Sequence, residues 1–328
     1  MLQYIIKRIL YMIPTLLVIS MVSFIIIQLP PGDYLDTLIA TMASQGESVN
    51  YEAMRALEDR YGLGQPIYVQ YYKWISNIIL RGDFGQSFTW NKAVSEIIWD
   101  RLLLTFVLSL ASLLFVWVVA FPVGIYSAVK QYSVGDYIAT FLGFIGLATP
   151  NFMIALILMY IAFKVFNQSV GGLFSPEYID AAWSWARVGD LLAHLWIPVI
   201  IIGTAGTAGL IRIMRANLLD ELKKPYVITA RAKGVSETRL LFKYPVRTAL
   251  NPFVSTVGWV LPELVSGEAI VAIVLSLPTT GPILLRALLQ QDMYLAGSFI
   301  MMLSTLTVVG TLVSDLLLAW LDPRIRLE

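Results

Sequence analysis

Apolar residues in this chain are gathered into long, nearly uninterrupted runs. Six such runs stand at residues 9–29, 102–129, 137–166, 191–214, 251–275 and 293–321. A helix rises 1.5 Å per residue, so each run is long enough to cross a hydrocarbon core about 30 Å thick. The pattern therefore predicts an all-α, polytopic membrane protein with six transmembrane helices.

Composition favours the same fold class. Of the 328 residues, 58% are hydrophobic and only 14% are charged, whereas soluble domains carry about 25% charged residues. The first run follows Lys7 and Arg8. It is longer than the apolar region of a typical signal peptide, and no small-residue cleavage site follows it, so we expect a retained first span.

The one long polar region, residues 30–100, follows the first span. Residues 51–61 and 66–80 predict amphipathic helices, and glycines at 62, 64, 82 and 85 separate them. Its nine acidic side chains outnumber its five basic ones, which suits an external face. We therefore divide the chain into 1–29 (N-terminus and first helix), 30–100 (external loop region) and 101–328 (five-helix core).

Basic residues mark the opposite face of the membrane. With six spans, both termini fall on one side, together with a basic segment at 215–250. Lys and Arg gathered on that side are Lys7, Arg8, Lys130, Arg324 and Arg326, besides those of the segment itself. Because cytoplasmic loops carry an excess of Lys and Arg, we expect both termini to be cytoplasmic.

The segment between the fourth and fifth runs is too well patterned to be a loose linker. From 223 to 252 it carries seven Lys or Arg residues against one acid, Glu237. Pro225 can open a short helix, Gly234 can close it and Ser236 can cap a second one. A basic cytoplasmic loop alone would explain the charge but not this Pro and Gly punctuation, so the sequence predicts a helix–Gly–helix element.

Three stretches of the chain resemble one known family. Tyr226-Val227-Ile228-Thr229-Ala230-Arg231-Ala232-Lys233-Gly234 is similar to the cytoplasmic coupling loop of permease subunits of dipeptide/oligopeptide ABC importers. Residues 63–88 resemble that family's external loop, and residues 322–326 (DPRIR) resemble its terminal signature. The resemblance covers nearly the whole chain. It implies that the following residues contact an ATPase: Pro225, Tyr226, Thr229, Ala230, Arg231, Ala232, Lys233 and Gly234.

The resemblance also implies a set of partners in a prokaryotic inner membrane. These are a second, similar permease, two ATP-binding subunits, an external solute-binding protein and membrane lipid; no nucleic acid is expected. Closure of the ATPases would pull the coupling helices together and open the cavity outward. Peptides are the family's usual solutes, while oligosaccharides, nickel chelates and opines also use this scaffold. Trp side chains stack on sugars, which keeps the oligosaccharide alternative open.

Catalytic and metal-binding chemistry is sparse in the sequence. The chain has no Cys, which excludes disulfides and thiolate chemistry. Its single His, His194, lies at the mouth of a span, where we expect an interfacial residue rather than a catalyst. No G-x-x-x-x-G-K-[ST] run is present, so ATP and Mg would be bound by partner subunits. The chain is thus expected to be a non-catalytic subunit.

Three residues inside the apolar runs are candidates for the translocation pathway. Glu263 and Glu268 lie in the fifth run, where a carboxylate costs about 2.5–3.5 kcal/mol. They stand roughly 140° apart on a helix, so a buried helix–helix contact remains an alternative for either. Pro150 lies near the middle of the third run, where a bend would shape a cavity or be a tolerated kink.

Two other classes of function remain open at this point. An ion-coupled secondary transporter could work through Glu263 or Glu268, and it would need no ATPase partner. A membrane receptor or assembly factor would bind partners but move no solute. The coupling-like segment argues against both.

Overall fold

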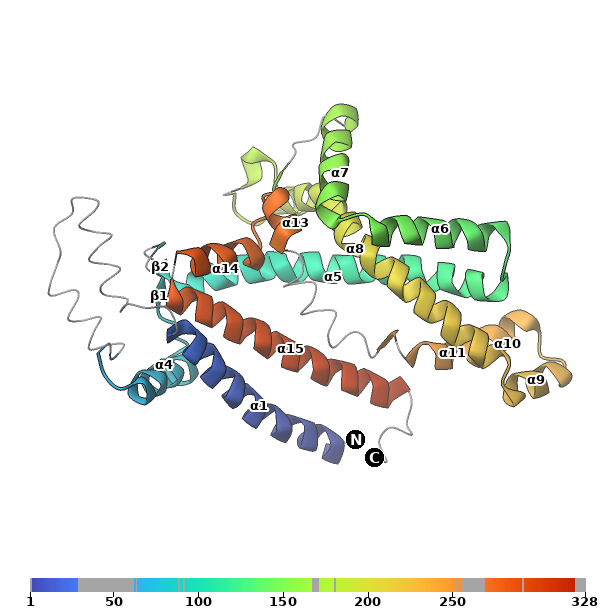
Figure 1. Cartoon of the computed structure of the whole chain (residues 1–328), viewed down its shortest axis with the longest axis horizontal. Helices are drawn as coiled ribbons and strands as arrows, with labels where there is room; N and C mark the ends of the chain where they lie inside the picture. Colours follow the sequence, from blue (N-terminus) through green and yellow to red (C-terminus); the bar gives the residue numbers. More distant parts are fainter. Residues whose placement is uncertain are drawn as a thin grey trace. The chain divides into compact units, whose positions relative to one another are not determined.

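The structure, a computed structural model, is all-α in the residues that it describes, apart from one very short strand pair (Figure 1). It describes residues 2–28, 62, 64–87, 89–90, 92–166, 171–179, 181–251, 253–254, 269–290 and 292–321. Its contacts divide the chain into two compact units that interleave along the sequence. Unit 1 holds residues 1–5, 104–279 and 307–328, and unit 2 holds 6–103 and 280–306.

Unit 2 contains the N-terminal helix and the elements around the polar region. They are most of α1 (Leu2–Gln28), α4 (Ile67–Arg81), β1 (Gln86–Ser87), β2 (Lys92–Ala93), the start of α5 (Val94–Val129), α14 (Thr280–Leu289) and the first half of α15 (Met293–Leu321). β1 and β2 are antiparallel, with Gln86 opposite Ala93. The core gathers aromatic rings, with Phe24 5.5 Å from Trp74 between ring centroids. The amphipathic helix predicted at 66–80 is confirmed as α4.

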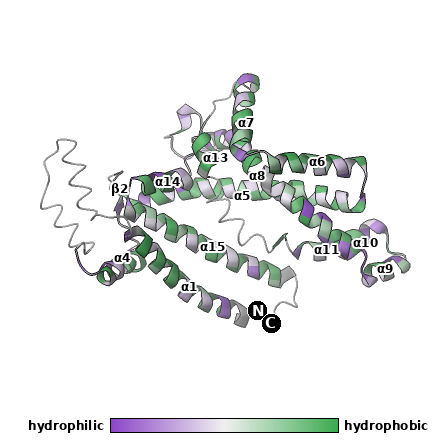
Figure 2. Cartoon of the chain, viewed as in Figure 1, coloured by the Kyte–Doolittle hydropathy of each residue, from purple (hydrophilic) through white to green (hydrophobic). Residues whose placement is uncertain are grey.

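Unit 1 contains the remaining apolar helices and the basic segment. Its elements are the rest of α5, α6 (Val134–Ala148), α7 (Asn151–Phe166), a 3-10 turn (Pro176–Tyr178), α8 (Trp185–Leu222), α9 (Pro225–Ala232), α10 (Glu237–Lys243), α11 (Pro245–Ala249), α13 (Ala269–Val274) and the end of α15. Hydrophobic residues dominate α5 and α6, whereas hydrophilic ones are frequent over α10 and α11 (Figure 2).

Four described helices are long and apolar enough to cross a membrane. They are Ile6–Ile26, Val94–Val129, Trp185–Thr204 and Tyr294–Ala319. A bent pair, Val134–Ala148 and Asn151–Val165, makes up to five. The predicted fifth run, 251–275, falls mostly outside the described residues, so the structure confirms the all-α membrane class but not the count of six.

The third predicted span is bent at Pro150, where the sequence left a bend or a tolerated kink open. α6 and α7 meet at 104°. Thr149 is extended, with φ −90° and ψ 123°, because Pro150 disfavours helical backbone in the residue before it. The described chain therefore contains a broken helix at the proline that the sequence marks as a candidate bend.

Two other spans extend well beyond their apolar runs. α5 begins at Val94 rather than near residue 102, and α8 covers Trp185–Leu222 rather than 191–214. In the added turns of α5, Val94, Ile97 and Ile98 are buried at helical spacing. Amphipathic turns of this kind continue a helix after its uninterrupted apolar run has ended.

Candidate coupling site

The basic segment forms a compact helical cap at the end of α8 (Figure 1). α8 closes with backbone bonds from Lys223 to Asp220 and from Lys224 to Glu221. Lys224 is extended, with φ −69° and ψ 146°, and Pro225 follows at the first helical position of α9. Its missing N–H would be unpaired there in any case, so the predicted role of Pro225 as a helix start is confirmed.

Gly234 ends α9 through a Schellman motif. Its φ is +76°, and its N–H donates to Arg231 O at 3.0 Å while Val235 N–H donates to Ala230 O at 3.3 Å. These are the two reverse bonds that define this C-terminal cap. A Cβ at Gly234 would meet nothing within 4 Å, so glycine is favoured here by backbone conformation rather than by crowding within the chain.

A small apolar cluster holds α9 against α10. Val227, Ala230 and Leu240 are buried, with Val235 and Tyr244 packed around them. Val227 and Ala230 are three residues apart, so they share one face of α9. The helical pair therefore has a core of its own.

An ion pair joins the same two helices on the exposed side. Arg231 donates from Nε and a terminal nitrogen to the two carboxylate oxygens of Glu237, at 2.6 and 3.1 Å. The hydrogen bond from Arg231 lowers the pKa of Glu237, and the pair raises the pKa of Arg231. Ser236 occupies the predicted N-cap of α10, but its side chain forms no capping hydrogen bond.

Tyr226 links α9 back to α8. Its hydroxyl donates to the carboxylate of Glu221. Desolvation, followed by this hydrogen bond, raises the pKa of Tyr226 to about 12. The phenol therefore stays protonated at physiological pH and keeps donating to Glu221.

Apolar side chains also stand on the outer surface of this element. Ile228 is 57% exposed and Phe242 is 55% exposed, beside the exposed Tyr226. Neither Ile228 nor Phe242 was among the predicted site residues. For Ile228 the sequence gives a sign of this exposure: it is an apolar residue that lies off the face of α9 formed by Val227 and Ala230. That face packs against α10, so Ile228 is left outside the small core.

The structure separates the eight predicted contact residues into two groups. Ala230 is buried against α10 and cannot face a partner. The other seven are exposed: Pro225, Tyr226, Thr229, Arg231, Ala232, Lys233 and Gly234. Thr229 also donates its hydroxyl to Pro225 O at 2.9 Å. A continuous exposed surface along α9 thus carries most of the predicted set.

The pathway candidates are described only in part. Pro150 is exposed at the bend between α6 and α7. Glu263 and Glu268 lie outside the described residues, as does the tail at 322–326. In the part of the chain that is described, no cluster of three His, Asp or Glu side chains could hold a metal ion.

That His194 lies at the membrane interface stays a prediction, while its packing within the chain is described. His194 is 7% exposed, and its Nδ1 lies 2.8 Å from Asp190 O, one helical turn earlier. Leu191 and Leu195 beside it are buried as well. The start of α8 is covered on this side, so His194 is part of a packed helix.

The sequence matches one family over most of its length. Residues 120–327 match the family described as "Binding-protein-dependent transport system inner membrane component". Residues 1–111 match the description of the N-terminal part of such membrane components. Together the two matches leave only a short stretch of α5 between them.

Curated relatives match along their whole length. The chain is 37% identical over 327 residues to the oligopeptide transport system permease protein AppB of Bacillus subtilis (strain 168), covering 99% of this chain and 100% of that protein. It is 31% identical over 340 residues to the dipeptide transport system permease protein DppB of Alkalihalophilus pseudofirmus, with coverage of 99% and 100%. It is 31% identical over 326 residues to the glutathione transport system permease protein GsiC of Salmonella paratyphi A, with coverage of 99% of each.

Proposed function

The chain belongs to the family of inner membrane components of binding-protein-dependent transport systems, and we propose that it forms half of the translocation pathway of an ATP-driven importer. The other half would be a second, homologous permease. An external solute-binding protein would deliver the solute. The arrangement of apolar helices supports a multi-pass position in the membrane.

The coupling role rests on one observation, the rigid α9–α10 pair at the end of α8. α9 follows directly on α8, which extends from Trp185 to Leu222 and contains Pro198, so a push on α9 reaches the C-terminal part of α8. Val227 and Leu240 fix the pair from inside, while Tyr226, Ile228 and Phe242 offer apolar contacts outside. Exposed apolar groups rimmed by polar residues mark protein interaction sites, and here the partner would be an ATPase subunit.

Peptides are the solute class that the comparisons favour. The relatives described above are named for oligopeptides, dipeptides and the tripeptide glutathione. We therefore propose a peptide or similar small oligomeric solute, in preference to an oligosaccharide. The chain would not alter the solute chemically, because the family consists of non-catalytic permease subunits. ATP and Mg would be bound by the two ATPase partners.

Uptake by the reconstituted complex tests the function. The permease, its partner permease, the ATPases and the binding protein would be placed in proteoliposomes with ATP inside and labelled tripeptide outside. We expect uptake that needs internal ATP and loaded binding protein and that an uncoupler does not reduce. Uptake abolished by an uncoupler but independent of ATP would instead indicate a secondary transporter.

A further inference from the structure

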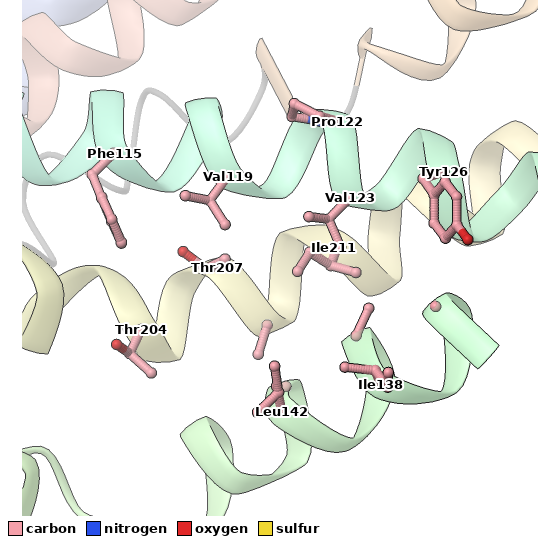
Figure 3. A pocket seen from close by; sticks show the side chains of 14 residues that line it. Phe115, Val119, Pro122, Val123, Tyr126, Ile138, Leu142, Thr204, Thr207 and Ile211 are labelled. Atoms are coloured by element: carbon pink, nitrogen blue, oxygen red, sulfur yellow. The ribbon is translucent and has the colours of Figure 1, made fainter.

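An apolar cavity of about 570 Å³ opens between α5, α6 and α8 (Figure 3). Along α5 it is lined by Phe115, Val119, Val123 and Tyr126, which follow one another on one helix face. The α6 wall includes Leu142. Nearly all the groups that face the cavity are hydrocarbon, so it suits an alkyl chain better than a peptide backbone, whose polar groups would be left unpaired.

The length of the cavity matches one leaflet of a bilayer. From Phe115 to Tyr126 there are eleven helical steps, or about 16 Å along the axis. This is about half of a 30 Å hydrocarbon core. Tyr126 is 46% exposed, and Tyr132 and Tyr137 are also exposed at the same end, as expected for aromatic residues at a membrane interface.

A smaller cavity of about 180 Å³ adjoins this end and carries positive charge. It shares Ala208 and Ile211 with the larger one, and it is also lined by Arg212 and Arg215. Arg215 forms an ion pair with Asp136, 3.0 Å between a guanidinium nitrogen and Oδ2. Arg212 is exposed and lies over the ring of Phe144, 5.7 Å from its centroid. Within the described residues, no carboxylate forms an ion pair with Arg212.

Thr207 of α8 also lines the apolar cavity. Thr207 is 8% exposed, and its hydroxyl has no hydrogen-bond partner in the described part of the chain. The hydroxyl oxygen is itself buried, so it adds no accessible polar group to the apolar wall of the cavity.

We propose that these joined cavities bind one anionic phospholipid. An acyl chain lies along α5 between Phe115 and Tyr126, and the phosphate binds Arg212. The guanidinium is suited to two-pronged contact with phosphate oxygens. Basic pockets between membrane helices are where anionic headgroups bind. The site lies apart from the α9 surface and does not depend on the solute class.

Photo-crosslinking in the assembled complex tests the proposal. The complex would be placed in nanodiscs of phosphatidylcholine with a trace of phosphatidylglycerol bearing a diazirine on its acyl chain. We expect adducts on peptides of α5, α6 and α8, about fivefold more than with a matched phosphatidylcholine probe, since one cation near the headgroup contributes about that factor. Arg212→Gln should abolish this preference and leave the choline-probe signal unchanged.

Filling the cavity gives a second arm. Ala208→Phe should remove the adducts from these peptides, whereas Ala216→Phe, at an exposed alanine two turns on, should not. If Ala208→Phe fails to assemble, Gly143→Leu fills the space from α6, where an added Cβ would lie 3.6 Å from Ala208 Cβ, an ordinary contact. Equal labelling by the two probes in the wild type, or labelling that survives both fillings, would overturn the proposal. Efficient crosslinking of Leu142→Cys to the second permease, or protection by excess peptide, would also overturn it by assigning the cavity to another occupant.

Discussion

Arg215 of α8 donates two hydrogen bonds to the carboxylate of Asp136 of α6, which lies 79 residues earlier in the sequence. Nε donates to Oδ1 at 3.2 Å, and a terminal nitrogen donates to Oδ2 at 3.0 Å. Asp136 is 3% exposed, and it also accepts the N–H of Tyr132 at 2.9 Å. One carboxylate thus fixes the turn between α5 and α6 to the part of α8 that leads into α9.

Removing this carboxylate should destabilise unit 1. We expect Asp136→Ala to lower the free energy of unfolding by about 2 kcal/mol, because charged hydrogen-bond partners are lost and Arg215 is left partly buried. Thermal unfolding of the purified chain in detergent measures the loss. In a double-mutant cycle, Arg215→Gln should cost little more once Asp136 is absent, and additive losses would contradict a direct link.

A second buried carboxylate, Asp292, performs a similar task in unit 2. It is 1% exposed and accepts the Ser87 hydroxyl at 2.5 Å and the N–H of Thr89 and Leu295 at 3.2 and 3.3 Å. Asp292→Ala leaves these donors unpaired and should cost about 2–3 kcal/mol. Ser87→Ala should cost about 1 kcal/mol. Unfolding temperatures of the two variants within error of the wild type would show that the network is not stabilising.

The sequence predicts local structure well and long-range pairing poorly. The all-α class follows from the lengths of the apolar runs, and the helix–Gly–helix element follows from Pro225 and Gly234, because these signals are local. Nothing local pairs Asp136 with Arg215, since the contact depends on how α6 packs on α8. Pro150 marks a bend, but its 104° angle depends on packing that the pattern does not contain.

The same limit applies within the coupling segment. The resemblance places Arg231 among the residues that contact an ATPase, and the structure pairs it within the chain with Glu237. The partner was visible six residues away in sequence. Only the turn at Gly234, however, brings α10 back so that the two side chains meet.

Acid should release the link between α9 and α10. Arg231 lowers the pKa of Glu237 from its ordinary value of 4.5. A carboxyl whose pKa is lower in the folded state contributes its full stabilisation above the ordinary value, and loses it as pH falls through the lowered value. Spin labels at Ala232→Cys and Thr238→Cys should therefore report a narrow distance distribution at pH 7 that broadens well below pH 4.5.

Two variants control for this titration. Glu237→Gln should give the broad distribution at every pH, because the charge is absent throughout. The exchanged pair Arg231→Glu with Glu237→Arg should restore the narrow one at pH 7. A distribution that does not change with pH in the wild type would mean that the apolar cluster alone sets the spacing.

The orientation of the chain is predicted from its charge asymmetry. The sequence has no Cys, so single cysteines report cleanly. Trp185 is 92% exposed at the start of α8, and Ser236 is exposed beyond its other end. In intact cells an impermeant maleimide should label Trp185→Cys and not Ser236→Cys, and permeabilised cells should label both. The reverse pattern would invert the assignment.

Gly234 provides the sharpest test of the coupling assignment. Its φ of +76° costs a side-chain-bearing residue about 1–2 kcal/mol, which is too little to unfold long apolar helices. The space around its Cβ is open within the chain. A large side chain at position 234 therefore adds backbone strain within the chain. It meets a steric clash only with a partner that covers the end of α9.

Gly234→Leu should consequently leave the membrane helices inserted while weakening capture of the ATPase subunits and ATP-driven uptake. Gly234→Asn is the matched control, because Asn adopts left-handed backbone at low cost and projects less far. It should retain most of the association and uptake. Pull-down of the ATPases and uptake into proteoliposomes measure the two effects separately. If Gly234→Leu binds ATPases and imports solute as the wild type does, no partner covers this end of α9. The ATPase would then have to contact this chain, and act on α8, through another surface, such as that around Phe242.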